Sequence, residues 1–487
     1  MVFSSFTFIF TFLPITLILY YISPRRVKNM ILLISSLVFY AWGEPIYIGL
    51  MVLSILFNYF CGKDIYLKMC QNENDSSGHL SVDGNQKKQK NMGVRISFVI
   101  AIIVNLLILG FFKYYGFLID TINTVAKTKI EYRQLGLPVG ISFYTFQAIS
   151  YLIDVYRGEV TAQKNIINFA LYIAMFPQLI AGPIVRYIDI EIQLKWREES
   201  LQKFGEGTRY FIVGLGKKVI LANSMGKIFE SVSQNFSSGI KMSIMMMWVG
   251  AIAYTLQIYF DFSGYSDMAV GLGKMFGFDL KKNFDYPYIS KSVTEFWRRW
   301  HISLGTWFRE YVYIPLGGNR VSAKKHIRNL LIVWMLTGLW HGAQWNFVIW
   351  GLYYGVLLIF EKYYLTKYLT RIPKILQHLY TMLMIVIGWV FFFSESAGSA
   401  LKYLGMMVGI GSKGFLHSQD CFVIVSNWGL WLAGIICCTS IGSGILNRNG
   451  YEGNGKWFTD LAYMMLFVIT ISWLITDSFN PFLYFRF

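Results

Sequence analysis

Long apolar runs recur along this sequence, and they restrict the fold more than any other feature. The early ones cover residues 3–21, 29–42, 47–61 and 96–117. A run of roughly 20 apolar residues can cross a bilayer as a helix. Lipid offers no partners to backbone hydrogen-bonding groups, and these runs are continuous rather than alternating. They therefore predict membrane helices rather than a barrel.

The composition agrees with a protein built of membrane helices. Of 487 residues, 55% are apolar and 15% are charged. We expect an all-α integral membrane protein, with roughly eleven to thirteen spanning or re-entrant helices in one membrane domain over residues 1–487. Its expected parts are N-terminal helices (1–62), a polar cytoplasmic loop (71–91), core helices (92–278), an amphipathic or re-entrant cytoplasmic segment (279–328), C-terminal helices (329–476) and an aromatic C-terminal segment (477–487).

The net charge of +17 fits either nucleic-acid binding or a membrane protein with basic cytoplasmic loops. The positions of the charges decide between the two. Arg25, Arg26 and Lys28 follow the first apolar run, and a second basic group lies at 87–95. Short basic loops between membrane helices are typical of the cytoplasmic side. The sequence thus predicts a multi-pass protein of a bacterial cytoplasmic membrane, in contact with lipid and not with nucleic acid.

The segment from Asp279 to Arg328 differs from its surroundings. It mixes tryptophan, tyrosine, proline and glycine with many lysines and arginines, and it contains no sustained apolar run. Amphipathic helices at the inner surface, partly re-entrant, would accommodate both the aromatic and the charged side chains. We expect this segment to bring polar groups into the membrane.

His341 is the main candidate for chemistry. It lies thirteen residues after Arg328, which corresponds to about 20 Å of helical rise and places it near the middle of the membrane. Gly338 and Gly342 would let backbone or substrate approach, and Gln344 and Asn346 add polar groups. A histidine that only packs between helices is the alternative. No metal-ligand spacing competes with it, and a neutral imidazole is well suited to accept a hydroxyl proton.

Other polar residues in apolar surroundings have either a role in the reaction or a structural role. His301, beside Arg298, would orient a substrate or would be an interfacial histidine among aromatic rings. Asp261 and Asp267 would line a cavity or, as we favour, would pair with arginines or backbone groups and hold a broken helix. The stretches 143–147 and 177–186 also suggest helix breaks.

Several motifs are similar to those of the membrane-bound O-acyltransferases. They are Trp-Arg-Arg-Trp-His-Ile-Ser-Leu (297–304), Tyr-Ile-Pro-Leu-Gly-Gly-Asn-Arg (313–320) and Leu-Trp-His-Gly (339–342). The stretches 142–151, 176–184 and 261–269 further resemble the bacterial alginate O-acetylation branch, which is related to the teichoic-acid D-alanylation branch. The resemblance implies a ring of helices around a thin centre, with His341 catalytic and His301 on the cytoplasmic approach. Around these motifs we assign substrate binding to Trp297, Arg298, Trp300, Ser303, Trp340, Gln344 and Asn346.

The resemblance also implies an acyl thioester donor, with no bound cofactor. Acetyl-CoA is the usual donor in the alginate-type branch, whereas the D-alanylation branch uses a carrier protein. The aromatic end of the chain, 481–487, resembles a motif whose tyrosine, here Tyr484, is proposed to carry the acyl group. An aromatic residue at the membrane interface is the alternative for Tyr484.

These observations predict an O-acyltransferase. An acyl group, most simply acetyl, would pass from a cytoplasmic thioester to a hydroxyl deprotonated by His341. Tyr484 or an extracytoplasmic partner enzyme would receive it first, and a cell-envelope polysaccharide last. The alternatives are D-alanyl transfer, a transporter or flippase of an envelope precursor, since broken helices also mark transport paths, and a scaffold that recruits an exported enzyme.

Overall fold

The computed structural model describes residues 1–76, 92–133, 135–180, 182–441, 456–476, 479–480 and 482–483. The described residues are helices joined by turns and irregular segments, which confirms the all-α prediction. The chain forms two compact units. Unit 1 comprises residues 1–204 and 273–280, and unit 2 comprises residues 205–272 and 281–487.

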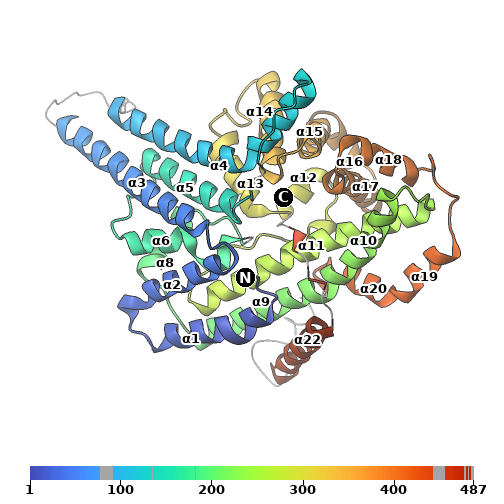
Figure 1. Cartoon of the computed structure of the whole chain (residues 1–487), viewed down its shortest axis with the longest axis horizontal. Coiled ribbons are helices and arrows are strands. Elements are labelled where there is room, and N and C mark those ends of the chain that lie inside the picture. The colour runs from blue at the N-terminus through green and yellow to red at the C-terminus, as the bar shows by residue number, and fades with distance from the viewer. Residues whose placement is uncertain are drawn as a thin grey trace. The chain divides into compact units, whose positions relative to one another are not determined.

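Unit 1 holds the N-terminal helices. They are η1 (Thr7–Phe12), α1 (Leu13–Ile22), α2 (Arg25–Gly43), α3 (Ile48–Ser76), α4 (Met92–Ala126), α5 (Ile141–Arg157), α6 (Ile166–Ala174), α7 (Phe176–Leu179) and α8 (Tyr187–Lys195). Helices α3, α4 and α5 lie side by side (Figure 1). Between α3 and α4, the buried amides of Asn58 and Asn105 donate to each other's oxygen over 3.1 and 2.8 Å. Such pairing satisfies polar groups inside apolar helices.

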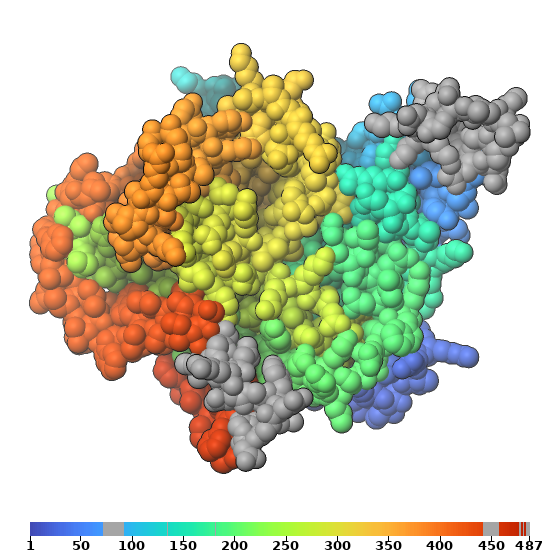
Figure 2. All heavy atoms as spheres, turned by 180° about the vertical axis from the view of Figure 1, so that it is seen from behind, coloured from blue at the N-terminus to red at the C-terminus, as the bar shows by residue number. Residues whose placement is uncertain are grey.

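Unit 2 holds the later helices, and α9 (Leu201–Gly216) begins just before it. The others are η2 (Lys217–Ala222), α10 (Asn223–Ser237), α11 (Ile244–Met275), η3 (Pro287–Ile289), α12 (Val293–Arg299), α13 (Ile302–Phe308), η4 (Arg309–Tyr313), α14 (Ala323–His341), α15 (Trp345–Phe360), η5 (Glu361–Leu365), α16 (Thr366–Leu369), α17 (Lys374–Phe393), α18 (Ala397–Met407), α19 (Ser418–Ser426), α20 (Trp428–Cys437) and α22 (Lys456–Thr476). Figure 2 shows a hollow on one face of this unit, between the yellow and the orange parts of the chain.

Five of the described helices are long and apolar enough to cross a membrane: Ile48–Gln71, Met92–Ala126, Ile244–Met275, Lys374–Phe393 and Trp457–Thr476. The bent pair α19 and α20 makes a sixth if it counts as one span. The chain is therefore a multi-pass membrane protein. The larger number expected from the apolar runs includes shorter or more polar helices, and their crossing stays a prediction.

The structure bears on three further local expectations. The break expected at 143–147 is wrong, because α5 continues through it from Ile141. The break expected at 177–186 is confirmed, since α7 ends at Leu179 and α8 begins at Tyr187. Of the loop expected at 71–91, residues 71–76 continue α3, and 77–91 lie outside the described residues.

The break expected beside Asp261 and Asp267 is also wrong, because α11 runs without interruption from Ile244 to Met275. Both carboxylates pair with lysines of η2 rather than with arginines. Lys218 lies 2.6 Å from Asp261, and Lys217 lies 2.7 Å from Asp267. A charge that is paired inside the protein can be accommodated without a change in helix path.

Glycines bring α14 and α15 into backbone contact. A Cβ atom on Gly338 would lie 2.2 Å from the carbonyl oxygen of Phe347, and one on Gly351 would lie 2.2 Å from that of Trp334. Small residues permit such approach between membrane helices. The space that the sequence left open beside Gly338 is thus filled by the backbone of α15, and the two helices form a tight hairpin.

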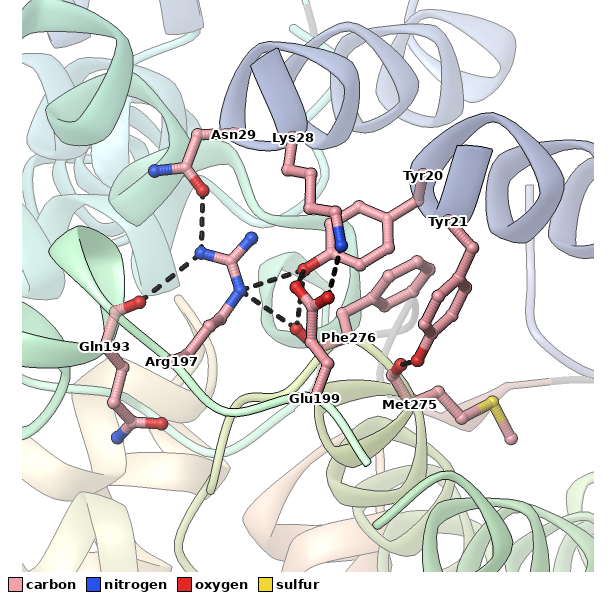
Figure 3. Close-up of polar contacts among 9 residues, drawn as sticks. All are labelled: Tyr20, Tyr21, Lys28, Asn29, Gln193, Arg197, Glu199, Met275 and Phe276. Atoms are coloured by element: carbon pink, nitrogen blue, oxygen red, sulfur yellow. Dashed lines mark hydrogen bonds and ion pairs between the residues drawn. The ribbon is translucent and has the colours of Figure 1, made fainter. Parts of the chain in front are cut away.

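A buried polar network ties the parts of unit 1 together (Figure 3). Lys28 of α2 pairs with Glu199, and Tyr20 of α1 donates to the same carboxylate over 2.5 Å. Arg197 donates to Tyr20 over 3.0 Å and to the carbonyl oxygen of Phe276 over 2.9 Å. Burial alone would raise the pKa of Glu199, but these hydrogen bonds and the charges of Lys28 and Arg197 lower it. The network fastens α1 and α2 to residues 197–199 and 275–276.

We expect Lys28→Met and Glu199→Gln each to lower the free energy of unfolding by about 1–3 kcal/mol, because each removes a charge-assisted hydrogen bond from a mostly buried pair. The double variant should lose less than the sum of the two. Thermal unfolding of the four purified proteins in detergent measures this, and strictly additive losses would contradict the pairing.

We expect Gly338→Ala to lower the folded yield and the midpoint of thermal unfolding, because the new methyl group collides with backbone that has little room to move. Overpacking typically costs about 1–3 kcal/mol. Gly110→Ala in α4 is the matched control, since a Cβ there meets no atom within 4 Å. Equal effects of the two substitutions would rule out the tight hairpin.

Candidate active site

The start of α12 is fixed by a carboxylate from another element. Glu361 of η5 is 2% exposed and accepts hydrogen bonds from the backbone N–H groups of Val293 and Thr294 over 2.7 and 2.8 Å. The Thr294 hydroxyl donates to it over 2.6 Å. Unpaired N–H groups and the helix dipole both favour an anion at a helix N-terminus. This contact fixes α12, which carries Trp300 and His301 just beyond its C-terminal end.

His301 occupies the tight connection between α12 and α13. Its φ of 46° lies in the left-handed region, and its side chain is buried. The Oδ1 atom of Asn283 accepts from the backbone N–H of Ser303 over 3.1 Å and from its hydroxyl over 2.9 Å. The same oxygen lies 3.3 Å from Nδ1 of His301, which assigns the ring proton to Nδ1. Asn283 therefore fixes both the ring and its tautomer.

The other nitrogen of His301 is unengaged. Within the described part of the chain, Nε2 is buried and has no hydrogen-bond partner. Burial lowers the pKa of His301 to about 3, so the ring is neutral at physiological pH. A neutral imidazole with a bare buried nitrogen can accept a hydrogen bond from a ligand.

His341 is the last residue of α14. The helix ends there because Gly342 takes an extended conformation before α15 begins at Trp345. The imidazole is 8% exposed, and ring centroids of Trp350 and Phe392 lie 5.1 and 5.3 Å away. Trp340 contacts both histidine rings, with centroids 4.9 Å from His341 and 5.8 Å from His301. One indole thus connects the two histidines.

His341 lines a small apolar pocket with a cavity volume of about 20 Å³, which we call the histidine pocket. Among the described residues, the ionisable groups that line it are His341 and Asp261. The lining residues are Ile258, Asp261, Phe262, Trp300, His341, Trp350, Trp389, Phe392, Phe482 and Leu483. Electrostatic interactions are stronger in such poorly hydrated surroundings than in water. A proton transfer to His341 would therefore take place largely shielded from bulk solvent.

A larger pocket of about 260 Å³, the polar pocket, adjoins the first and shares Phe392 and Leu483 with it. Its polar lining residues are Ser233, Ser237, Tyr254, Gln344, Asn346, Ser394, Glu395, Ser399 and Tyr403. The amide nitrogen of Asn346 donates to the carbonyl oxygen of Ser394 over 2.8 Å. Its amide oxygen is buried without a hydrogen-bond partner among the described residues, so it can receive a donor from a ligand.

The structure brings together only some of the predicted site residues. Trp300 and His341 line the histidine pocket, whereas Gln344 and Asn346 line the polar pocket. Trp297 packs against the rings of Trp334, Trp350, Tyr354 and Trp389. Arg298 is exposed, and Ser303 bonds to Asn283. Tyr484 lies outside the described residues.

Other site residues were not predicted. Asn283 lies in a short polar stretch with no motif to mark it, although it orients His301. Trp350, Trp389 and Phe392 belong to apolar runs and look like core residues in the sequence. Leu483 also lines the histidine pocket, although it lies far along the chain from the lining residues of α11, α14 and α15.

Comparison with known proteins identifies the family of this chain. Residues 161–404 match the membrane-bound O-acyltransferase (MBOAT) family. The chain is 37% identical, over the full length of both proteins, to the protein named probable alginate O-acetylase AlgI in Azotobacter vinelandii. It is 35% identical to the peptidoglycan O-acetyltransferase of Helicobacter pylori, over 86% of this chain and 81% of that protein. The teichoic acid D-alanyltransferase of Bacillus subtilis is 31% identical over 46% of this chain and 60% of its own.

The family match covers half of the chain and includes both histidines, and the similarity to the alginate O-acetylases extends over the whole sequence. The resemblance seen in the motifs is confirmed: this chain belongs to the membrane-bound O-acyltransferase family.

Proposed function

We propose that the chain moves an acetyl group from cytoplasmic acetyl-CoA to a hydroxyl on the outer side of a bacterial cytoplasmic membrane, for O-acetylation of a cell-envelope polysaccharide. The names of the relatives, alginate O-acetylase and peptidoglycan O-acetyltransferase, support this acyl group and this class of acceptor. The observation that carries the proposal is the position of His341 in an apolar pocket that adjoins a polar one.

In the proposed reaction His341 accepts the proton of the acceptor hydroxyl. The hydroxyl oxygen attacks the thioester carbonyl carbon, and the carbon–sulfur bond of the resulting intermediate breaks. The thiolate then takes the proton from the imidazolium, so that the products are an ester and a free thiol. A positioned general base of this kind typically contributes about 10²–10⁴-fold to the rate.

The two pockets suit different reactants. The histidine pocket is small and is lined mainly by aromatic and aliphatic side chains, which suit the acetyl end of the thioester. The polar pocket offers hydroxyl, amide and carboxylate groups, which suit a hydroxyl-bearing acceptor. Nε2 of His301 and the ring of Trp340 would orient the donor near His341.

The alternatives are weaker. Family membership favours a transferase over a transporter or a scaffold. D-Alanyl transfer from a carrier protein is the nearest alternative, but the relatives with that name match under half of the chain. Thiol release from acetyl-CoA by the purified protein, tested beside a D-alanyl carrier protein, discriminates between the donors.

We expect His341→Ala to lower thiol release from acetyl-CoA at least about 10²-fold, because the base is lost, while the protein stays folded in detergent. His378→Ala is the control, since His378 lines neither the histidine pocket nor the polar pocket and its Nδ1 lies 3.1 Å from the carbonyl oxygen of Ser290. Release at the wild-type rate by His341→Ala would exclude His341 as the base.

We expect Tyr484 to be acetylated during turnover, because the phenolate of a tyrosine ester is a better leaving group than an alkoxide and so permits onward transfer. Mass spectrometry of the C-terminal peptide should find the acetyl group in the wild type and not in Tyr484→Phe, which keeps the ring. Tyr368→Phe, at an exposed position, is the control. Undiminished transfer by Tyr484→Phe would remove the relay and leave the role of His341 intact.

A further inference from the structure

Asp261 joins α11 to the C-terminal tail, defined here by the described residues Phe479, Asn480, Phe482 and Leu483. One carboxylate oxygen lies 2.6 Å from Nζ of Lys218, and the other accepts the backbone N–H of Leu483 over 2.8 Å. The side chains of the ion pair are each 3% exposed. A buried pair of this kind is costly to desolvate and adds little stability by itself. Stability alone therefore does not explain why the ion pair lies beside the C-terminal tail.

Further contacts hold the same tail. Lys218 also donates to Asn223 over 2.9 Å, and Asn223 donates to Asn480 over 3.3 Å. The ring of Phe482 lies 4.8 Å from that of Tyr265. Lys218 and Asp261 thus contribute to holding both Asn480 and Leu483.

Leu483 lies at the boundary between the histidine pocket and the polar pocket. Its side chain, 5% exposed, lines the histidine pocket and the polar pocket, and Phe392 is the other residue common to both linings. One pocket is mainly apolar and contains His341, whereas the other is polar. An apolar side chain at this boundary hinders the passage of water from the polar pocket toward His341.

We propose that Asp261 is a positioning residue that holds the C-terminal tail through the N–H of Leu483, and that Leu483 and Phe392 form a partition between the two pockets. This inference rests on the proposed function, in which a thioester reacts beside His341. The partition directs the acyl group to the acceptor. Without it, water attacks the thioester carbonyl carbon, the carbon–sulfur bond breaks, and acetate and free thiol are the products.

Two double variants separate the hydrogen bond from the ion pair. Lys218→Met/Asp261→Asn removes both charges but keeps an amide oxygen for the N–H of Leu483. Lys218→Met/Asp261→Leu removes the charges and the acceptor. Replacing both members of a buried pair by neutral groups of similar size is often tolerated, so both variants should remain folded.

The position of the tail is measured without reference to activity. Carboxypeptidase Y is added to each purified protein in detergent, and intact mass spectrometry follows the loss of Leu483 and Phe482. We expect Lys218→Met/Asp261→Leu to lose these residues on the order of tenfold faster than Lys218→Met/Asp261→Asn, because only the second keeps the hydrogen bond to the N–H of Leu483. Equal rates in the two variants would overturn the role of Asp261.

The partition is tested with Leu483→Ala. Its share of hydrolysis, acetate formed per acyl group transferred from acetyl-CoA, should rise several-fold over the wild type. Leu256→Ala is the matched control, because Leu256 is 6% exposed and packs in the same apolar cluster without lining either pocket. An unchanged ratio in Leu483→Ala overturns the partition. Absence of thiol release by the wild type instead overturns the proposed function, and the protease measurement still decides whether Asp261 holds the tail.

Discussion

The backbone contact between α14 and α15 is the constraint on which the site depends. The two helices are in backbone contact at Gly338 and Gly351. This contact fixes how α14 and α15 align along each other. His341 ends the first helix, and Trp350 on the second meets its ring. The main-chain geometry of the hairpin therefore positions the catalytic candidate. Under the proposed function, this geometry keeps the base in place while its ring gains and loses a proton.

The two histidines differ in how they are supported. His301 lies in a strained left-handed connection and depends on Asn283, which also holds Ser303. His341 lies at a helix end in contact with Trp340, Trp350 and Phe392. The first arrangement suits a residue that presents one nitrogen in a fixed tautomer, and the second suits a residue that exchanges its proton. Trp340 contacts both rings, so a displacement of one histidine would shift the indole that packs against the other.

Much of this could be read from the sequence, and the remainder has physical reasons. The apolar runs predicted the helices, and the glycines beside His341 predicted close approach. The break expected in α11 was wrong because nothing in the sequence showed that Lys217 and Lys218, on η2, would neutralise Asp267 and Asp261. Leu483 was missed because it lies 222 residues from Asp261, and only tertiary structure brings the two together. Trp350 and Trp389 of the histidine pocket were indistinguishable from core residues, whereas Trp300 stood in a recognisable motif.

The contact between Leu483 and Asp261 also governs when the enzyme becomes complete. During synthesis α11 enters the membrane long before residue 483 leaves the ribosome, and α14, α15 and α17 follow it in order along the chain. Until the C-terminal tail has been synthesised, Asp261 is paired with Lys218, and the pocket beside it lacks Phe482 and Leu483. On the proposed partition, the wall around His341 is therefore complete only after residue 483 has been translated. A nascent chain that already contains both histidines would still have an unsealed site.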